Sequence, residues 1–284
     1  MVSTQQLCNS EDSARIKLQL MNYNHNGTHG TYGFALTSLA EMRSKGSSFT
    51  YSLQDQTGKS SGVLRVSPFQ FVEKPNFLDY LRSGWFINMA VAVDFTASNG
   101  EQMEPNCLHK QYNQPNMFND YEKGLLSVGQ VLEPYAFETK FAAFGFGGVP
   151  RFAGQNSVSH CFNLTGLPDP SVQGLNGLFT SYKTAIMGTS LSGPTYFGPI
   201  LETLRIFINQ NMNMQMYHTL VIFTDGAIHD FNQVVDLIVE MSNLPLSIII
   251  VGIGSANFGA METLDGDEQR LRSSRGVMAS RDIV

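Results

Sequence analysis

The chain contains 284 residues, of which 42% are hydrophobic and 15% are charged, so it can bury a sizeable core and extensive disorder is not expected. Its formal net charge is −6 and its lysines and arginines form no cluster, which argues against nucleic acid as the main partner, because phosphate binding requires concentrated positive charge. The longest apolar run, near residues 246–254, is shorter than the roughly 20 residues that a membrane-spanning helix requires.

Residues 1–76 are predicted to form an antiparallel β segment. The apolar runs in this part, such as IKLQLMNY, FTYSLQ and SGVLRV, are short and are separated by stretches rich in asparagine, glycine and serine. Short alternating runs with turn-forming residues between them are typical of β-strands joined by turns.

From residue 77 onward, longer elements of two types alternate, which predicts a second domain over residues 77–284. Nearly continuous apolar runs indicate buried strands, and apolar residues at every third or fourth position indicate helices. The predicted strands cover residues 86–95, 141–146, 217–226 and 246–254, and the predicted helices cover residues 119–135, 174–188, 196–210 and 231–243. This pattern predicts an α/β domain with a doubly wound, mostly parallel sheet that is covered by helices on both faces.

The start of the last predicted helix carries a local signal. Asp230 and Gln233 have the spacing of a capping box, in which the first side chain bonds a backbone amide three residues ahead. We therefore expect Asp230 to cap the helix that begins there.

Polar side chains follow two of the predicted strands at their carboxyl ends, which is where open α/β sheets bind ligands. The run VAVDFTASNG ends a strand at Asp94 and continues through Thr96 and Ser98, a second strand ends at Asp225, and Thr195 stands just ahead of a helix. For DFTAS alone, helix capping is the commoner role of such residues. The two carboxylates and three hydroxyls taken together form an all-oxygen set, which hard cations such as Mg²⁺ and Mn²⁺ prefer.

These motifs resemble a known family. DFTASNG, the threonine of GPTYF, and TDG are similar to the metal-ion-dependent adhesion site (D-x-[ST]-x-S, Thr, Asp) of von Willebrand factor A domains. The segments FLDYLRSGWFINMAVAVDFTASNG, FAAFGFGG, SGPTYFGPI, LVIFTDGAIHD and SNLPLSIIIVGIGSANFGAMETLDGD resemble the copine A domain in order and spacing, over residues 77–284. Carried across position by position, the resemblance implies a metal set of Asp94, Thr96, Ser98, Thr195 and Asp225.

The same resemblance implies a cytosolic protein in which two C2 domains bind membrane phospholipid in response to calcium and an A domain recruits protein targets. Copines usually continue past RDIV into a further apolar stretch, so this chain is expected to stop short of the last strand of the A domain. Residues 1–76 resemble the back half of a second C2 domain. The acids of its second calcium loop, D-x-D-x-x-x-x-x-D, fall here on Asn22, Asn24 and Gly30, so Ca²⁺ binding by this chain is not expected.

The cysteines Cys8, Cys107 and Cys161 are odd in number and have no metal-binding spacing, which predicts reduced thiols. The N-terminal residues lack the basic and apolar regions of a secretion signal. We therefore expect a cytoplasmic protein, peripheral to the membrane only through C2 domains in a full-length form.

Two other classes of function remain open at this stage. A phosphotransferase of the haloacid dehalogenase type also uses a strand-end aspartate and Mg²⁺ in a D-x-D-x-T pattern, but Thr96 stands where its acid–base aspartate belongs. The second class is a structural remnant, in which the site binds no metal. The favoured prediction is a non-enzymatic binding module in which Mg²⁺ or Mn²⁺ connects the domain to an exposed Asp or Glu of a protein partner.

Overall fold

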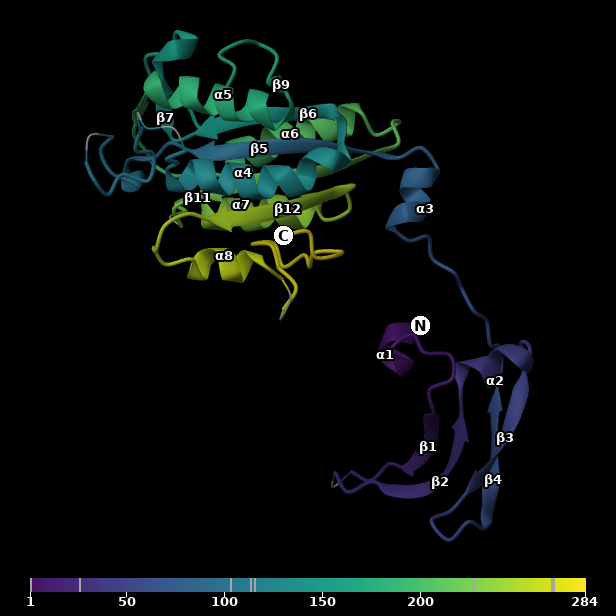
Figure 1. Cartoon of the computed structure of the whole chain (residues 1–284). Coiled ribbons are helices and arrows are strands. Elements are labelled where there is room, and N and C mark those ends of the chain that lie inside the picture. Colours follow the sequence, from purple (N-terminus) through teal and green to yellow (C-terminus); the bar gives the residue numbers. More distant parts are fainter. Residues whose placement is uncertain are drawn as a thin grey trace. The chain divides into compact units, whose positions relative to one another are not determined.

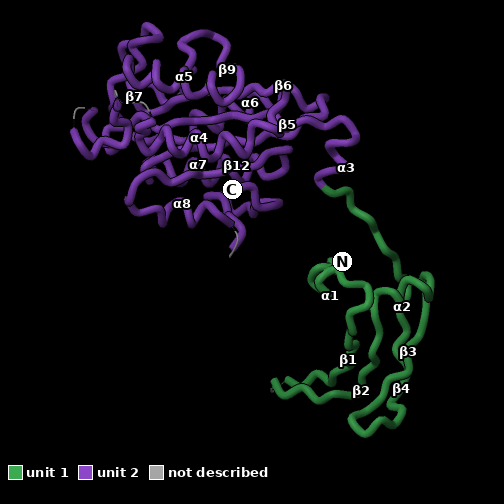
Figure 2. Tube along the Cα trace, in the orientation of Figure 1, with its two compact units in different colours: residues 1–76 green, residues 77–284 purple. Residues whose placement is uncertain are grey.

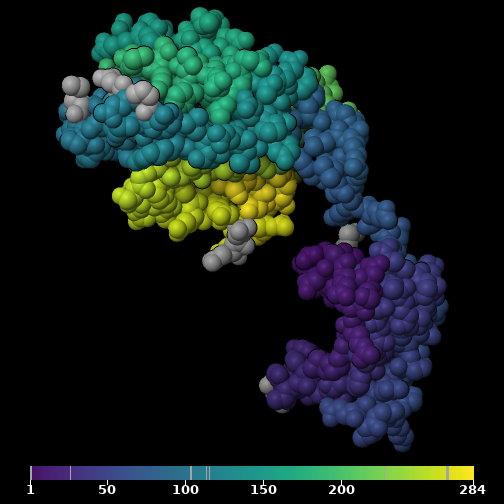
Figure 3. Space-filling view, viewed as in Figure 1, coloured from purple at the N-terminus to yellow at the C-terminus, as the bar shows by residue number. Residues whose placement is uncertain are grey.

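The chain forms two compact units, Met1–Asn76 and Phe77–Val284 (Figure 1, Figure 2). The computed structural model describes all residues except 1, 26, 103, 113, 115, 227, 267 and 268. In the part of the chain that it describes, no helix has both the length and the apolar character needed to cross a bilayer. Each unit has a hydrophobic core of its own. A space-filling view shows the outer surface of the described residues, coloured along the sequence (Figure 3).

The N-terminal unit contains one four-stranded antiparallel sheet, as its short alternating runs predict. The strands β1 (Ile16–Asn22), β2 (Gly30–Thr37), β3 (Phe49–Gln54) and β4 (Ser60–Val66) lie in chain order, with the helices α1 (Thr4–Cys8) and α2 (Leu39–Ser44) beside them. Along β3 every second side chain is buried. The core is small, and Leu36 of β2 and Val63 of β4 remain more than half exposed.

The larger unit is built on a six-stranded sheet in the order β12-β11-β5-β6-β8, with β9 also paired to β6. Its strands are β5 (Phe86–Asp94), β6 (Ala136–Phe146), β8 (Phe162–Asn163), β9 (Ser171–Gln173), β11 (Met216–Thr224) and β12 (Leu246–Gly252). The pairs β12–β11, β11–β5 and β5–β6 are parallel, whereas β8 and β9 run antiparallel to β6. The predicted mostly parallel sheet is therefore confirmed.

The remaining elements complete the larger unit. A two-stranded sheet pairs β7 (Gly148–Pro150) with β10 (Thr189–Leu191). The α-helices are α3 (Phe77–Arg82), α4 (Asp120–Leu132), α5 (Gly174–Met187), α6 (Gly198–Gln210), α7 (Phe231–Met241) and α8 (Gly259–Leu264), and the short 3₁₀ turns are η1 (Ala97–Asn99), η2 (Glu133–Tyr135) and η3 (Arg151–Ala153).

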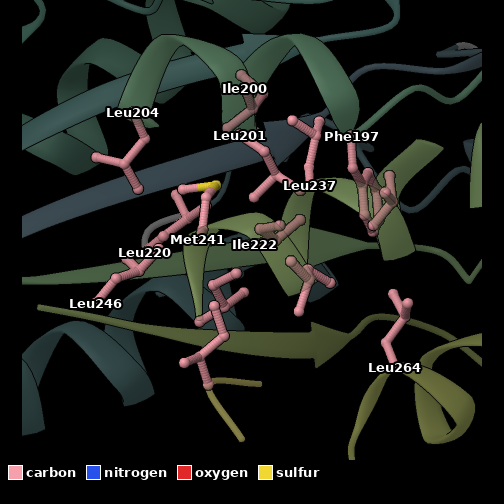
Figure 4. Packing of buried hydrophobic residues seen from close by; sticks show 14 of the residues in the cluster. Phe197, Ile200, Leu201, Leu204, Leu220, Ile222, Leu237, Met241, Leu246 and Leu264 are labelled. Atoms are coloured by element: carbon pink, nitrogen blue, oxygen red, sulfur yellow. The ribbon is translucent and has the colours of Figure 1, made fainter. Parts of the chain in front are cut away.

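Both faces of the sheet are covered, because successive side chains of its central strands enter different cores. Leu220 and Ile222 of β11 pack with residues of α6 and α7, and Leu201 and Leu204 of α6 point toward the strands (Figure 4). Val221, between them in sequence, packs on the other face with residues of α4 and α5. Full burial of one such side chain is worth about 1.5–3 kcal/mol, so the two cores hold the strand ends in fixed positions. The doubly wound α/β class is confirmed.

The predicted start of α7 is confirmed, but the capping bond expected of Asp230 is absent. Asp230 stands at the N-cap position of α7, but its side chain makes no capping hydrogen bond to that helix. Instead its carboxylate accepts hydrogen bonds from the backbone amides of Phe197 (3.1 Å) and Gly198 (2.7 Å) at the start of α6. A neighbouring helix that presents two unpaired amides and a positive dipole end competes successfully with the helix that follows in sequence.

Candidate metal centre

The carboxyl ends of β5 and β11 lie side by side. The two strands are parallel neighbours in a register that places Val93 opposite Phe223. Asp94 is the last residue of β5, and Asp225 directly follows the last residue of β11. The fold therefore brings together the two acids that end separate strands in the sequence.

Asp94 is completely buried and its carboxylate is held by hydroxyl and amide donors. Its Oδ1 atom accepts hydrogen bonds from the backbone amide of Thr96 (2.8 Å) and from the Oγ1 hydroxyl of the same residue (2.6 Å). Its Oδ2 atom accepts a hydrogen bond from the Oγ1 hydroxyl of Thr224 (2.8 Å). Asp94 therefore has a fixed orientation at the strand end.

The environment of Asp94 is unfavourable for a negative charge. Burial raises the pKa of this carboxyl group to about 6, and the charge of Asp225 acts in the same direction, against the hydrogen bonds from Thr96 and Thr224. Neither acid takes part in any ion pair within the described part of the chain. The two buried acids thus lie near enough for the charge of one to affect the other, and neither has a basic partner among the described residues.

Asp225 carries the clearest sign of a missing partner. The residue is only 5% exposed, and its Oδ1 atom is buried and accepts no hydrogen bond from the described residues. An unpaired buried acceptor costs about 1–3 kcal/mol, and more when it is charged. A cation bound at this oxygen would remove that penalty.

The predicted hydroxyl groups stand around the same edge. Thr96 is buried, and because its Oγ1 atom donates its proton to Asp94, the oxygen acts toward its other neighbours as an acceptor, which is also the role of a metal ligand. The exposed Ser98 places its Oγ atom 2.9 Å from Thr96 Oγ1. Hydroxyl and carboxylate oxygens are the ligands of Mg²⁺ and Mn²⁺, so the donor chemistry fits such an ion.

Thr195 reaches this edge on the loop between β10 and α6. The loop is tied to the DFTAS segment, since the backbone amide of Ala97 donates to the carbonyl oxygen of Ser192 at 2.5 Å. It is tied to the Asp225 loop by His229, whose backbone amide donates to the carbonyl oxygen of Thr195 (2.9 Å) and whose Nδ1 atom accepts from the amide of Thr195 (3.2 Å). The buried Thr195 therefore lies in a loop bonded to both acid-bearing segments.

A glycine makes room for Thr96. A Cβ atom on Gly147, just after β6, would lie 2.2 Å from the Cγ2 atom of Thr96, and Gly147 has a φ of +78°. Both the contact and the left-handed backbone exclude a larger residue at this position without displacement. The GFGG sequence thus allows the loop after β6 to approach the DFTAS segment closely.

The predicted donors at this edge are two acids and three hydroxyl groups. Among the described residues, no group of three or more His, Cys, Asp or Glu side chains is arranged to hold a metal. The two acids would therefore need the hydroxyl groups of Thr96, Ser98 and Thr195 to complete a coordination shell.

The sequence did not predict the residues that support Asp94 through hydrogen bonds and packing. Thr224 and Asn99 stand beside the predicted motifs, but nothing in their spacing distinguishes them from strand and turn residues. His109 and Tyr121 come from segments distant in sequence, and His109 donates from Nε2 to the carbonyl oxygen of Asp94 at 2.8 Å. Their role is visible only after folding.

The predicted remnant of a calcium loop lies at the tip of the β1–β2 hairpin. Asn22 and Gly30 pair across the hairpin end and are exposed. The side-chain amide of Asn24 donates to the carbonyl oxygen of Thr28 at 2.7 Å. Because the sequence has no acid between Asp12 and Glu41, no carboxylate belongs to this hairpin.

Comparison with known proteins identifies the family. A model of the copine family matches residues 107–284. Protein BONZAI 1 of Arabidopsis thaliana is 40% identical over 100% of this chain and 50% of its own length, and Protein BONZAI 2 of the same organism is 38% identical over the same shares. Copine-A of Dictyostelium discoideum is 37% identical over 99% of this chain and 47% of its own length.

Similarity to solved structures is much lower. The manganese-loaded TRAP protein of Plasmodium vivax is 14% identical, with a TM-score of 0.44 over 67% of this chain and 66% of that one, a likeness too low to support conclusions about this site. The chain spans about half the length of the curated relatives it matches. The family match and the identity to these relatives show that this chain belongs to the copine family.

Proposed function

We propose that Phe77–Val284 is a non-enzymatic, metal-ion-dependent recognition module. In this proposal, Mg²⁺ or Mn²⁺ binds at the sheet edge through Asp94, Thr96, Ser98, Thr195 and Asp225. The two acids balance the charge of the ion, the hydroxyl groups complete its oxygen shell, and an exposed Asp or Glu of a protein partner takes an open coordination position.

The observation that carries the proposal is the unbalanced charge of Asp94 and Asp225. Both acids are buried, neither has a basic partner among the described residues, and one oxygen of Asp225 is unpaired. Burying a charge without a partner is strongly unfavourable, and bound cations are a common way in which proteins balance buried carboxylates.

The surroundings leave room for a partner. An open hollow of about 1010 Å³ lies beside Asp225, lined by polar and apolar residues that include Ser98, Asn99, Leu108, Asp120, Ile253 and Asn257. Neither Lys nor Arg lines it. An acidic partner side chain would therefore have to be held by the ion itself, which supports a metal-dependent mode of recognition.

Titration calorimetry with Mg²⁺ and with Mn²⁺ tests the metal site. We expect saturable binding to the wild-type chain, loss of binding in Asp225→Ala, and unchanged binding in Asp169→Ala. Asp169 is a suitable control because its carboxylate is also used locally, at the backbone amide of Ser171, but lies in a different loop. Equal binding by the Asp225 variant and the wild type would contradict the assignment.

Recognition is tested with a partner whose binding has been measured at millimolar Mg²⁺. We expect EDTA to release it and the replacement of its exposed Asp or Glu by Asn or Gln to weaken it. Binding that survives both EDTA and Asp94→Ala would place the partner on another surface. Turnover of phosphoesters that depends on Mg²⁺ and on Asp94 would instead favour the phosphotransferase class.

For longer forms of the protein, we propose a cytoplasmic location with attachment to membrane phospholipid through complete C2 domains. The support is the family membership and the three cysteines, all of which are unpaired thiols in the folded chain. Fractionation of cells with and without calcium, compared between full-length and shortened forms, tests this proposal.

A further inference from the structure

We propose that His109, Tyr121 and Asn99 are positioning residues that hold Asp94 and Thr96 in a geometry suited to a small octahedral cation, so that the site prefers Mg²⁺ to Ca²⁺. This inference rests on the proposed metal site and assigns its ion selectivity to residues that contact no ion. It is carried by a buried aromatic and hydrogen-bonded cluster behind the strand end.

His109 fixes the backbone of Asp94. The imidazole is completely buried between two rings, with centroid distances of 4.1 Å to Tyr121 and 5.4 Å to Phe95, both nearly parallel. Because the carbonyl oxygen of Asp94 can only accept, the Nε2 atom at 2.8 Å carries the proton, and Nδ1 accepts from the hydroxyl group of Tyr182 (2.8 Å). Burial lowers the pKa of His109 to about 3, so the ring stays neutral in this arrangement.

Tyr121 fixes the orientation of Asn99. Its buried hydroxyl group donates to the Oδ1 atom of Asn99 at 2.7 Å, which directs the amide nitrogen of Asn99 toward the acid-bearing loop. That nitrogen donates to the carbonyl oxygen of Thr96 at 3.1 Å and lies 3.4 Å from Asp94 Oδ1. Burial and the nearby carboxylates raise the pKa of Tyr121 well above its ordinary value, so the hydroxyl group remains a donor.

The rigidity of this cluster has a direct consequence for the choice of cation. Mg²⁺ requires near-ideal octahedral geometry at about 2.0–2.1 Å, whereas Ca²⁺ accepts variable geometry at 2.3–2.6 Å. Loosening the support of Asp94 and Thr96 should therefore weaken Mg²⁺ binding more than Ca²⁺ binding. A merely structural role would instead lower stability without changing the ratio of the two affinities.

Calorimetric titration of Mg²⁺ and of Ca²⁺ into wild type, Tyr121→Phe and Tyr217→Phe tests the inference. Tyr217 is a matched control, because its hydroxyl group also makes one hydrogen bond, to Ser247 Oγ at 2.7 Å, at the opposite end of β11. We expect Tyr121→Phe to weaken Mg²⁺ binding roughly 3- to 10-fold and to lower the ratio of Mg²⁺ to Ca²⁺ affinity about threefold, the range expected for one hydrogen bond. The control should change neither value.

A double-mutant cycle with Asn99→Ala examines the route of the effect. If Tyr121 acts through Asn99, Tyr121→Phe should change the affinity ratio in the wild-type background and not in the Asn99→Ala background. If the Tyr121→Phe variant does not fold, the Asn99→Ala variant serves as the test, and it must lower the ratio of Mg²⁺ to Ca²⁺ affinity. Wild-type binding with an unaltered ratio in both variants would overturn the positioning role alone, whereas a wild type that binds neither cation would overturn the metal site and this inference with it.

Discussion

The tip of the β1–β2 hairpin and the carboxyl edge of the large sheet both offer oxygen atoms, yet their surroundings differ. At the hairpin, Asn22 and Gly30 are exposed, the amide of Asn24 is engaged in the turn, and the hairpin sequence contains no acid. At the sheet edge, Asp94 and Asp225 are buried and unbalanced. Buried charge without a partner therefore favours the sheet edge over the hairpin as the proposed cation site.

The difference is one of free energy. An exposed amide oxygen gains little free energy when it exchanges a water molecule for an ion, because the amide contributes no charge. A buried carboxylate pair lacks the solvation that would stabilise it, so a bound cation recovers free energy that the metal-free fold has lost. A change of charge should therefore alter stability and the Mg²⁺ response at the sheet edge, and alter neither at the hairpin.

The largest expected effect follows from Asp94→Asn. Because the metal-free fold holds two like charges in a buried site, removal of one should raise the stability of the larger unit by about 1–3 kcal/mol at pH 7. The same change should abolish stabilisation by Mg²⁺. Thermal unfolding in EDTA and in millimolar Mg²⁺ measures both. Asn22→Asp in the hairpin is the control and should change neither value. If Asp94→Asn lowered the stability of the chain in EDTA, the proposed repulsion between the two acids would be contradicted.

A smaller effect is expected from pH. The folded-state pKa of Asp94 is about 6, above its ordinary value of 3.8, so the folded chain binds this proton more tightly than the unfolded chain. This contribution to stability is complete at acidic pH and is lost as the pH rises, by about 1 kcal/mol between pH 5 and 7. The difference between the unfolding curves of wild type and Asp94→Asn in EDTA isolates this group. If the difference in stability between the two chains stayed constant from pH 5 to 7, this assignment of the pH dependence to Asp94 would be contradicted.

The smallest effect concerns the hairpin. The wild-type chain should not sediment with acidic lipid vesicles in a calcium-dependent manner, since no carboxylate lies between Asp12 and Glu41. The double variant Asn22→Asp, Asn24→Asp should show at most a weak rise in melting temperature, and only at millimolar Ca²⁺. Calcium-dependent sedimentation of the wild-type chain would show that another surface binds membranes.

The sheet could be predicted because its information is local. The apolar run of β5 and the helical spacing of α4 each report burial through residues close in sequence, and parallel pairing follows from their alternation. The short strands β8 and β9 carry no comparable signal, because two or three residues cannot establish a period. The grouping of the strand-end acids could be predicted for a similar reason, since parallel strands bring their carboxyl ends to one edge.

The rest of the site depends on contacts between distant segments. Asp230 shows the limit clearly, because the sequence contains the helix that follows it but not the amides of α6 that fold against it. His109 likewise has no neighbouring residue that indicates its bond to Asp94. Its neutral, stacked state is a property of the assembled core.

Gly147 has a consequence for how this chain can vary. It supplies no oxygen and no charge, yet any side chain there would occupy the space of the Thr96 methyl group and would force the backbone out of its left-handed conformation. Displacement of Thr96 would in turn move a hydroxyl group bonded to Asp94. Mutational scanning for Mg²⁺ binding should therefore find this position as intolerant of replacement as the acids themselves, although its residue has no side chain.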